Sequence, residues 1–507
     1  MSLGSVLNTA RSALAAQQLV IDTAGHNIAN AQTAGYTRQR VELAAATPQQ
    51  MPYGTVGAGV SVTDITRARD ALLDTSVRQE AGGESAAAQR HALLSGVEEV
   101  LGEPSDTGLA SAMDAFWSGW SDLAAQPTSG AAKAVVVQRG AAVATMLNQF
   151  DGRLADLRTQ AAATVDDGLT QVNGLATQIA DLNRQIVADE VSGHPSNDLR
   201  DARDRAVDQL AAFGTVQALP KPDGSVHVTF GSYALVDGIA ARQLQRTTDA
   251  DGTAALAFAD QPSQALKPVG GSVQENLDFL NGGAQDVQDR LDALANTLAR
   301  AVNQVVAQRT DASNVPAGPF FVSKVDGQFD ATADPYATPG AAGAVTARTI
   351  RVSAALTNDA SGVPASSSAA RPSDNDLALA LAGLRTSTGA TLGGVSVTFQ
   401  LPDRTKAPVV AGGVTTPVRG AASAPTSFAD FYSATVSGLG VQVKAAADDA
   451  EVRGTLASQA RARRDSADGV NVDEELTTLM QAQQAYAAAA KVVTAADEMM
   501  KTLVEMI

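Results

Sequence analysis

The sequence contains no cysteine among its 507 residues. This absence excludes disulfide bonds, thiolate catalysis and zinc sites built on cysteine. Histidine is also scarce, and no two of the four have the i, i+4 spacing of a zinc-binding pair on a helix. These histidines are His26, His91, His194 and His227. Residue spacing therefore supports no metal site.

Motifs for phosphate binding and nucleophilic catalysis are missing as well. The glycines form no Gly-x-Gly-x-x-Gly loop, no Gly-Lys-Ser/Thr and no Gly-x-Ser-x-Gly elbow. Residues 249–252 resemble the start of a calcium loop, but the closing bidentate glutamate is missing, which favours a plain turn. We therefore predict no catalytic, cofactor-binding or metal-binding residues, and no enzymatic activity.

Positive charge is in short supply. Lys and Arg number 37 against 54 Asp and Glu, a formal net charge of −17, so the surface is unsuited to neutralising nucleic-acid phosphates. No apolar run approaches the roughly 18 residues of a membrane span. The N-terminal residues lack the features of a cleaved secretory signal. We expect no nucleic-acid partner, no membrane partner, and export, if any, without signal cleavage.

Apolar heptads occupy both ends of the chain. Apolar residues spaced by three and four lie along one side of a helix and must be buried against other helices. The N-terminal row consists of Leu3, Leu7, Ala10, Leu14, Gln17, Ile21, Ala24 and Ile28. The C-terminal row runs from residue 472 to Ile507, and Asn471 with Glu474 predicts a capping box at its start. Chain ends normally fray, so such regular seams predict that the ends join copies or partners.

The middle of the chain predicts long helices with one hairpin. Residues 70–210 read as helices, with a clear inward stripe from Val165 to Ile186, and residues 284–308 as another. Pro222-Asp-Gly224 predicts a turn between two strands within residues 219–235. Trp117 and Trp120 fall on a helix, where core packing is favoured over a partner-binding patch.

Composition shifts at about residue 311. From there to about residue 427 the chain is rich in Gly, Pro, Ser and Thr, with short β-branched runs at 344–353 and 394–401. We predict a mainly α fold with an inserted β-rich domain, in which the terminal helices form a coiled coil next to a rod-like bundle of long helices. The domains expected are a terminal coiled-coil domain (1–45 and 470–507), an elongated helical-bundle domain (46–310 and 428–469, with a small β-hairpin region near 215–240) and a variable, β-rich outer domain (311–427).

Three stretches carry a resemblance to a known family. Residues 27–39 end in Gly35-Tyr-Thr-Arg-Gln39, residues 197–204 read Asn-Asp-Leu-Arg-Asp-Ala-Arg-Asp, and residues 469–475 read Gly-Val-Asn-Val-Asp-Glu-Glu. Residues 483–491 continue the last motif. In this order they resemble the bacterial flagellar axial proteins, and within that family the hook-associated proteins at the junction of hook and filament. The resemblance is strong at both ends, moderate in the helical body and almost absent in residues 311–427.

The resemblance implies a structural role and specific partners. Family members leave the cell unfolded through the flagellar type III export apparatus and lie outside it in the flagellum. The resemblance implies a ring of copies of this chain, contacts with the hook protein on one side and with a second junction protein on the filament side, and a mechanical adapter function. We also expect an export chaperone to hold the C-terminal helix, whose apolar seam would otherwise invite aggregation.

The seams and the matching motifs together define the predicted assembly interface. It comprises Leu3, Leu7, Leu14, Ile21, Ile28, Asn30, Thr33, Gly35, Tyr36, Arg38, Gln39, Leu476, Leu479, Gln483, Tyr486, Val493, Met500, Val504 and Ile507.

Other functions stay open at this point. Within the same class, the alternatives are a hook or rod subunit and a flagellin-like subunit. The long helical middle and the Arg38-Gln39 ending disfavour a hook or rod subunit, and the run at residues 469–475 disfavours a flagellin. From a different class, residues 311–427 form a surface adhesin built on the same scaffold. An enzyme inserted in the middle is the third alternative, and it lacks any acid pair or metal ligands with convincing spacing.

Overall fold

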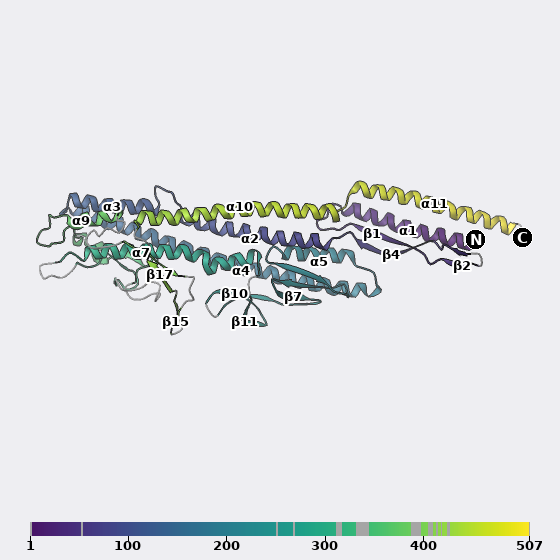
Figure 1. Cartoon of the computed structure of the whole chain (residues 1–507), viewed down its shortest axis with the longest axis horizontal. Coiled ribbons are helices and arrows are strands. Elements are labelled where there is room, and N and C mark those ends of the chain that lie inside the picture. Colours follow the sequence, from purple (N-terminus) through teal and green to yellow (C-terminus); the bar gives the residue numbers. More distant parts are fainter. Residues whose placement is uncertain are drawn as a thin grey trace.

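The computed structural model describes residues 3–51, 54–249, 252–266, 269–310, 317–330, 344–386, 397–403, 409–411, 414–416, 418–422 and 426–505. Long helices run nearly parallel to one another and give an elongated rod, with the first and last helices together at one end (Figure 1). None of the helices described has an apolar stretch suited to crossing a bilayer.

The end of the rod that holds both termini is built from two helices and a β-ribbon. Helix α1 (Leu3–Asn30) packs along α11 (Val472–Glu505), and the two run in opposite directions (Figure 1). Strand β1 (Gln39–Ala45) pairs with β4 (Val60–Arg67) in an antiparallel ribbon beside α1, and β2 (Gln49–Met51) pairs with β3 (Gly54–Val56) at its tip. The predicted helices at both ends of the chain are therefore present.

Four helices make up most of the body. Helix α2 (Ala71–Leu101) packs along α10 (Phe428–Asp468), and α3 (Leu109–Ala125) packs on the 60-residue α4 (Gly130–Asp189). The side chains of Asp70, Ser129 and Ser427 accept hydrogen bonds from backbone amides in the first turns of α2, α4 and α10, which fixes where these helices begin. The predicted inward stripe of α4 is confirmed, since Val165, Ile179 and Ile186 are fully buried.

The larger core lies at the end of the rod away from the termini. It joins α3, α4, α10 and α7 (Ala284–Val306), and its centre is aromatic. The predicted core packing of Trp117 and Trp120 is confirmed, because these side chains are 2% and 0% exposed. Phe116 contacts both indole rings and also Phe320 and Phe321.

A second core lies beside the C-terminal half of α4. It is formed with α5 (Asn197–Leu210), α6 (Gly271–Asp278) and two antiparallel sheets. One sheet has the order β5-β6-β7-β8 (Val216–Pro220, Val226–Phe230, Tyr233–Asp237, Ala240–Ala241) and contains the predicted hairpin. The other has the order β11-β10-β9 (Gln261–Leu266, Ala254–Phe258, Leu244–Thr248) and was not predicted.

The described part of residues 311–427 mixes short strands and helices. These are β12 (Phe321–Ser323), β13 (Ile350–Val352), α8 (Ala354–Asn358), α9 (Asp376–Gly383), the 3-10 turn η4 (Leu384–Thr386), β14 (Gln400–Asp403), β15 (Val409–Ala411), β16 (Val414–Thr416) and β17 (Val418–Ala422). Leu377, Leu381 and Phe399 belong to the same core as Trp120, so this region shares its hydrophobic interior with the helical body. The predicted fold class, mainly α with an inserted β-containing region, is confirmed, while the division into three domains stays a prediction.

Candidate assembly interface

The two terminal helices contact each other through small side chains. Ala10, Ala16 and Ala24 are the buried apolar residues of α1, and each is less than 5% exposed. In α11 the buried positions include Glu475, Ala482 and Ala496, which fall on one seven-residue repeat. Alanine faces allow a close approach but bury little apolar area, so this contact within the chain is a modest one.

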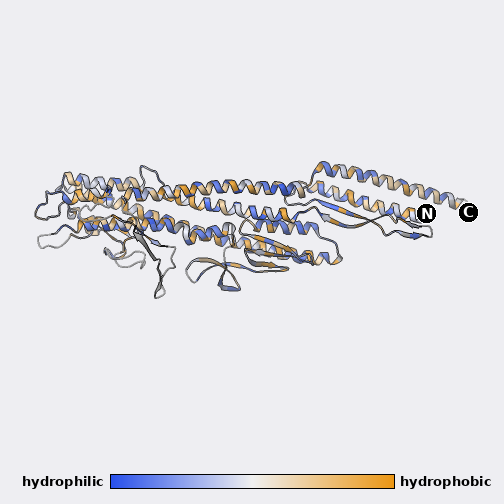
Figure 2. Cartoon of the chain, in the orientation of Figure 1, coloured by the Kyte–Doolittle hydropathy of each residue, from blue (hydrophilic) through white to orange (hydrophobic). Residues whose placement is uncertain are grey.

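Most of the predicted α11 interface residues lie outside that contact. Leu476, Tyr486, Met500 and Val504 are 45%, 38%, 45% and 71% exposed, and Gln483 is exposed as well. Leu479 and Val493 are half-buried. Further large apolar side chains of α11 share this exposure: Val472, Met480, Val492 and Met499. Hydrophobic and hydrophilic residues alternate along the whole of α11 (Figure 2), so the helix has apolar surface left over after pairing with α1.

The predicted α1 residues are partly covered. Leu7, Leu14, Ile21 and Ile28 are all half-buried in the single chain. The side chain of Leu3 lies outside the described residues, and so does Ile507. The sequence pattern therefore located the helices, whereas the α11 face that packs within the chain is displaced from the predicted seam.

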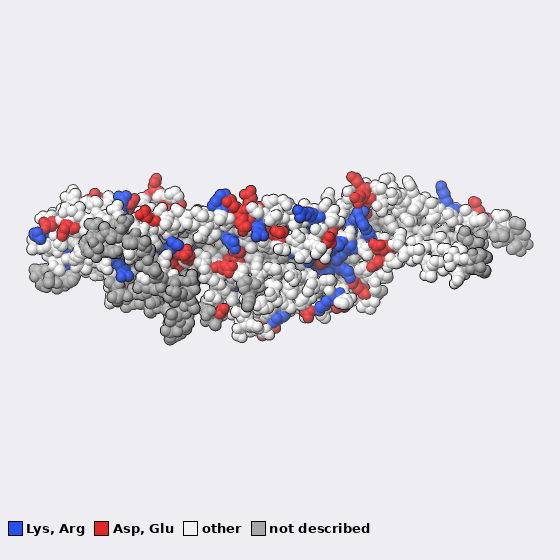
Figure 3. All heavy atoms as spheres, in the orientation of Figure 1, with Lys and Arg blue, Asp and Glu red and all other residues white. Residues whose placement is uncertain are grey.

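The remaining predicted residues lie where the terminal helices meet the body, in a region that we call the joint. It is formed by residues 27–39, the end of β4, the start of α2, α5, and the α10–α11 link at residues 464–475. Lys, Arg, Asp and Glu gather there, while the surface of the terminal helices beyond is mostly uncharged (Figure 3). The three motifs that resemble the flagellar axial proteins therefore meet in one place.

Arg38 connects the first part of the chain to the last helix. Its Nε donates to Oε1 of Glu475 at 2.6 Å and its Nη1 to Oε2 of Glu474 at 2.8 Å. Asn27 in α1 donates its Nδ2 to the other oxygen of Glu475 at 3.0 Å, and the backbone amide of Arg38 donates to the carbonyl of Asp468 at 3.0 Å. Charged hydrogen bonds in a buried setting are strong when all partners are satisfied, so this cluster fixes the base of α11 against α1.

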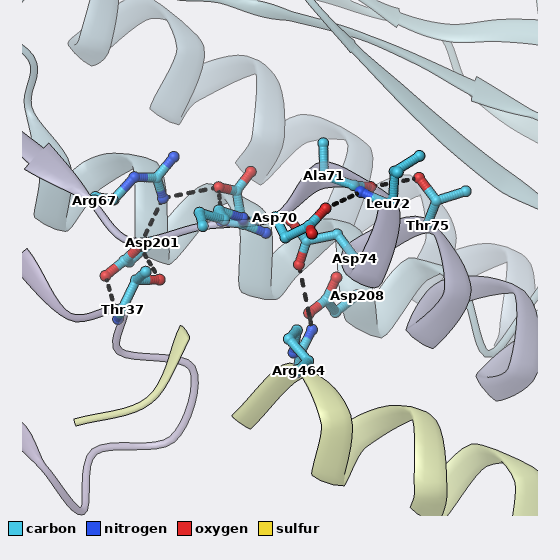
Figure 4. A network of polar contacts seen from close by, with 12 residues as sticks. Thr37, Arg67, Asp70, Ala71, Leu72, Asp74, Thr75, Asp201, Asp208 and Arg464 are labelled. Carbon is cyan, nitrogen blue, oxygen red and sulfur yellow. Dashed lines mark hydrogen bonds and ion pairs between the residues drawn. The ribbon is translucent and has the colours of Figure 1, made fainter. Parts of the chain in front are cut away.

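Thr37 and Gln39 connect the same segment to α5. The backbone amide and the Oγ1 of Thr37 each donate to a carboxylate oxygen of Asp201 at 2.9 Å (Figure 4). Gln39 donates its Nε2 to Asp198 at 3.0 Å and its backbone amide to Asn27 Oδ1 at 3.0 Å. The motif at residues 27–39 is thus hydrogen-bonded directly to the motif at residues 197–204.

Arginines from β4, from the link between β4 and α2 and from α5 itself neutralise the acids of α5. Arg67 Nη1 lies 2.6 Å from Oδ1 of Asp201 and 2.9 Å from Oδ2 of Asp204. Burial opposes the charge of Asp204, but the guanidinium groups of Arg69, Arg203 and Arg67 outweigh it and hold the pKa of Asp204 below its usual value. The carboxylate therefore stays ionised in the folded chain.

Tyr36 and Gly35 shape the turn after α1. The Tyr36 hydroxyl donates to Asn27 Oδ1 at 2.8 Å, and its pKa is raised by burial and by the nearby carboxylates of Asp198, Asp201 and Glu475. Gly35 has φ of +72°, and a side chain there would collide with Arg205. At the exposed end of the helix, Thr33 donates its Oγ1 to Asn30 Oδ1 at 3.3 Å and its backbone amide to the Asn30 carbonyl at 2.8 Å. Asn30 donates its Nδ2 to the carbonyl of His26 at 3.1 Å. Within this motif, Asn27 and residues 36–39 are tied to other segments of the chain, whereas Asn30 and Thr33 bond only locally among the described contacts.

A second acidic group lies beside the start of α2. Arg464 Nη1 is 2.6 Å from Oδ2 of Asp208 and 3.7 Å from Oδ1 of Asp74 (Figure 4). Asp468 follows on α10, where burial and then the Asp74 carboxylate raise its pKa to about 6. The joint therefore contains one carboxyl group that titrates close to neutral pH.

One expectation at this site was wrong in detail. Asn471 does cap α11, accepting from the amide of Asp473 at 3.0 Å, but the carboxylate of Glu474 binds Arg38 instead of completing a capping box. Sequence reasoning also missed Glu475, which is 3% exposed and lies at the centre of the cluster. Glu475 was not predicted as an interface residue because it lies in the first turn of a helix, where acidic side chains usually face solvent. No group of three or more His, Asp or Glu side chains in the described ranges is arranged to hold a metal ion.

Comparison with known proteins distinguishes between the possible axial proteins. The ends match broad models: "Flagella basal body rod protein" over residues 7–37 and "Flagellar basal body rod FlgEFG protein C-terminal" over residues 466–506. The middle, residues 94–321, matches "Flagellar hook-associated protein FlgK helical domain". Flagellar hook-associated protein 1 of Bacillus subtilis (strain 168) is 27% identical over 98% of this chain and 97% of its own length. Over almost its whole length the chain is therefore similar to flagellar hook-associated protein 1.

Two further relatives of the same name differ in how much of the chain they cover. Flagellar hook-associated protein 1 of Escherichia coli (strain K12) is 26% identical over 99% of this chain and 100% of its own length. The Salmonella typhimurium protein of the same name is 28% identical over 63% of this chain and 59% of its own length. A solved structure, the flagellar hook junction protein FlgK from Burkholderia pseudomallei, is 19% identical, covers 81% of this chain and 99% of that chain, and gives a TM-score of 0.48.

Proposed function

We propose that copies of this chain form a ring that joins the flagellar hook to the filament and acts as a mechanical adapter between them. The α1–α11 pairs would form the inner part of the ring, and the helical bodies would radiate from it. The hook protein would contact the ring on one side and a second junction protein on the filament side. The role is structural, without catalysis, and the protein works outside the cell.

The observation that carries this proposal is the apolar surface of α11. Val472, Leu476, Met480, Tyr486 and Val504 are between 38% and 71% exposed, although the helix already has a partner in α1. Full burial of such a side chain is worth roughly 1.5–3 kcal/mol, so several per subunit supply a strong drive for association. A helix with small residues on one face and large exposed apolar residues elsewhere is suited to contact more than one neighbour.

The joint supports the adapter role. It ties α1, α11, α2, α5 and α10 together through charged hydrogen bonds, so force on the inner helices passes to the body at one defined place. The link at Gly469 between α10 and α11 is the short non-helical connection on that path. We propose that this link absorbs small changes of angle while the ion pairs limit them.

Export requires protection of the same apolar surface. We propose that a chaperone covers α11 before export, with Leu476, Tyr486 and Met500 at its contact. A chain truncated at Gly469 should then lose chaperone binding, and unchanged binding would contradict this part of the proposal.

Location tests the proposal most directly. Serum raised against residues 94–321, which avoids the ends shared with rod proteins, is applied with gold label to intact flagella. A narrow band where hook meets filament is expected. Label along the whole filament would indicate a flagellin-like subunit, and label within the hook or rod would indicate a hook or rod subunit. If flagella carried no label, the proposal would be wrong and the adhesin alternative would be favoured.

The interface itself is tested by a matched pair of variants. Leu476→Asp places a charge on the exposed surface of α11, whereas Val441→Asp places the same charge at a 70% exposed position of α10 in the body. We expect Leu476→Asp to abolish filament attachment and to release unassembled protein into the medium, while Val441→Asp swims normally. Equal behaviour of the two variants would show that α11 is not the assembly surface.

A further inference from the structure

A cavity of about 410 Å³ lies between α3 and the first turns of α10, at the end of the rod away from the termini. This volume falls within the range of roughly 300–1,000 Å³ that small-molecule sites occupy. Nothing in the assembly role of α1, α11 or the joint involves this cavity. It is therefore a separate feature that needs its own explanation.

The inner wall of the cavity is apolar and aromatic. Met113 and Trp117 from α3 face Phe428 and Tyr432 from α10, and all four side chains are at most 3% exposed. The rings of Trp117 and Phe428 lie 5.5 Å apart and are tilted by 37°. Because these side chains are fixed by the core behind them, the wall is preformed and needs no ordering on binding.

One carboxylate in the lining has only neutral partners. Glu103 accepts hydrogen bonds from the amides of Ser105 and Ala110, at 3.0 and 3.1 Å, and from the Tyr432 hydroxyl at 3.4 Å. Within the described part of the chain, no Lys, Arg or His forms an ion pair with it. The negative charge of Glu103 is thus held in place beside the aromatic wall by neutral donors, with no cationic side chain of the described residues paired to it.

The other charges of the lining cancel each other. Arg385 Nε lies 3.0 Å from Oδ1 of Asp114 at the more exposed rim of the cavity. The cavity as a whole therefore carries one net negative charge, and it sits next to Tyr432. Aromatic faces and a fixed carboxylate both attract an organic cation, while the apolar wall favours a ligand with a hydrocarbon stem.

We propose that this cavity binds an alkylammonium group, with its stem against Trp117 and Phe428 and its ammonium at Glu103. Two sources share this chemistry: a free amine, and the side chain of a lysine on a neighbouring protein. The site is independent of the ring interface, so a variant that fails to assemble still carries it.

The test uses the full chain and matched six-carbon probes. Hexylammonium, hexanol and hexanoate are titrated while the tryptophan fluorescence is followed, to which Trp117 in the wall and Trp120 behind it both contribute. We expect saturable binding of hexylammonium with a dissociation constant on the order of 1 mM, given so few heavy atoms, and at least about tenfold weaker binding of the other two probes. Equal binding of hexanol and hexylammonium, or no saturable binding, would overturn the proposal.

Two variants assign the site. Glu103→Gln should weaken hexylammonium binding about tenfold and leave hexanol unchanged, whereas Glu99→Gln, which removes the same charge at an exposed position outside the lining, should change neither. Val436→Phe fills the cavity without touching Glu103 and should abolish binding of every probe, which keeps the test decisive if Glu103→Gln unfolds the loop. Undiminished binding to both site variants would place the ligand elsewhere and overturn the proposal.

A blocked lysine distinguishes the two sources. If N-acetyl-lysine-N-methylamide binds as tightly as hexylammonium, the site accepts a lysine side chain from a protein neighbour. If only hexylammonium binds, the peptide backbone is excluded and the source is a free amine. Both results support an ammonium site, provided that Glu103→Gln also weakens the binding of the probe.

Discussion

Arg38 and Glu475 are 437 residues apart in the chain, yet Arg38 Nε lies 2.6 Å from Glu475 Oε1. The side chains are 14% and 4% exposed, so the pair is sheltered from water and salt. Asn27 holds the second oxygen of the same carboxylate. This contact joins the segment after the first helix to the start of the last helix, and it sets the position of α11 relative to the body.

Removing Arg38 should loosen the terminal helices without unfolding the body. Arg38→Ala leaves Glu475 buried without its cation, a situation that typically costs about 3–5 kcal/mol. We expect faster amide hydrogen exchange in residues 472–490, and unchanged exchange in α4. Arg40→Ala, an exposed neighbour in β1, is the control and should have no such effect. Faster exchange throughout the chain would mean that the cluster stabilises the whole fold.

Asp468 makes the joint sensitive to pH. Burial and the Asp74 carboxylate raise its pKa to about 6, above that of an unfolded aspartate near 4, while Arg69 and Arg464 act in the opposite direction. The folded chain therefore keeps a proton that the unfolded chain has lost, and this group's contribution to stability decreases as pH rises from about 4 to about 6. Asp468→Asn should remove this slope and be the more stable form at pH 7.

Thermal unfolding between pH 4 and pH 8 measures the effect as a difference between the two proteins. The two proteins are compared because a second group also makes stability depend on pH. Asp292, half-buried on α7, has its pKa raised to about 7 by burial, and it contributes equally to the wild-type chain and to Asp468→Asn. Asp292→Asn serves as a comparison that changes the body alone. Parallel pH profiles for the wild-type chain and Asp468→Asn would contradict the assignment.

Asn183 fastens the first sheet to the long helix. Its carboxamide donates to the carbonyls of Val226 and Gly238, at 3.0 and 2.7 Å, and accepts from the amide of Val226 at 3.1 Å. Asn183→Leu leaves these buried backbone groups unpaired, and we expect a loss of about 3 kcal/mol in the free energy of unfolding. Gln171→Leu on the exposed side of the same helix should cost less than about 0.5 kcal/mol. Urea denaturation measures both, and similar losses would show that the hydrogen bonds are unimportant.

The terminal helices should gain order on assembly. The fully buried apolar side chains described in α1 and α11 are all alanines, so these helices bury little apolar area in a single chain. We expect weak amide-exchange protection of residues 4–28 in the free chain and strong protection once the protein is built into flagella. Strong protection of these residues in the free chain would refute the expectation.

The sequence was informative wherever a pattern is local. Heptads predicted α1 and α11, and the stripe from Val165 to Ile186 predicted the buried face of α4 correctly, since side-chain direction repeats every 3.6 residues in a helix. Pro222-Asp-Gly224 located the hairpin for the same reason, because turn geometry depends on neighbouring residues. The second sheet was not predicted, since its strands β9 to β11 lack a regular alternation of apolar residues.

Only the tertiary structure decided which segments of the chain pack against each other. The C-terminal seam predicted a buried row that includes Leu476 and Tyr486, but α11 turns Glu475, Ala482 and Ala496 toward α1 and leaves those larger residues exposed. The acids at 473–475 read as an ordinary first turn, and only the fold brings Arg38 and Asn27 to Glu475. Periodicity specifies which residues share a helix face, whereas the neighbour of that face depends on contacts between segments hundreds of residues apart, and their free energies appear only in the folded chain.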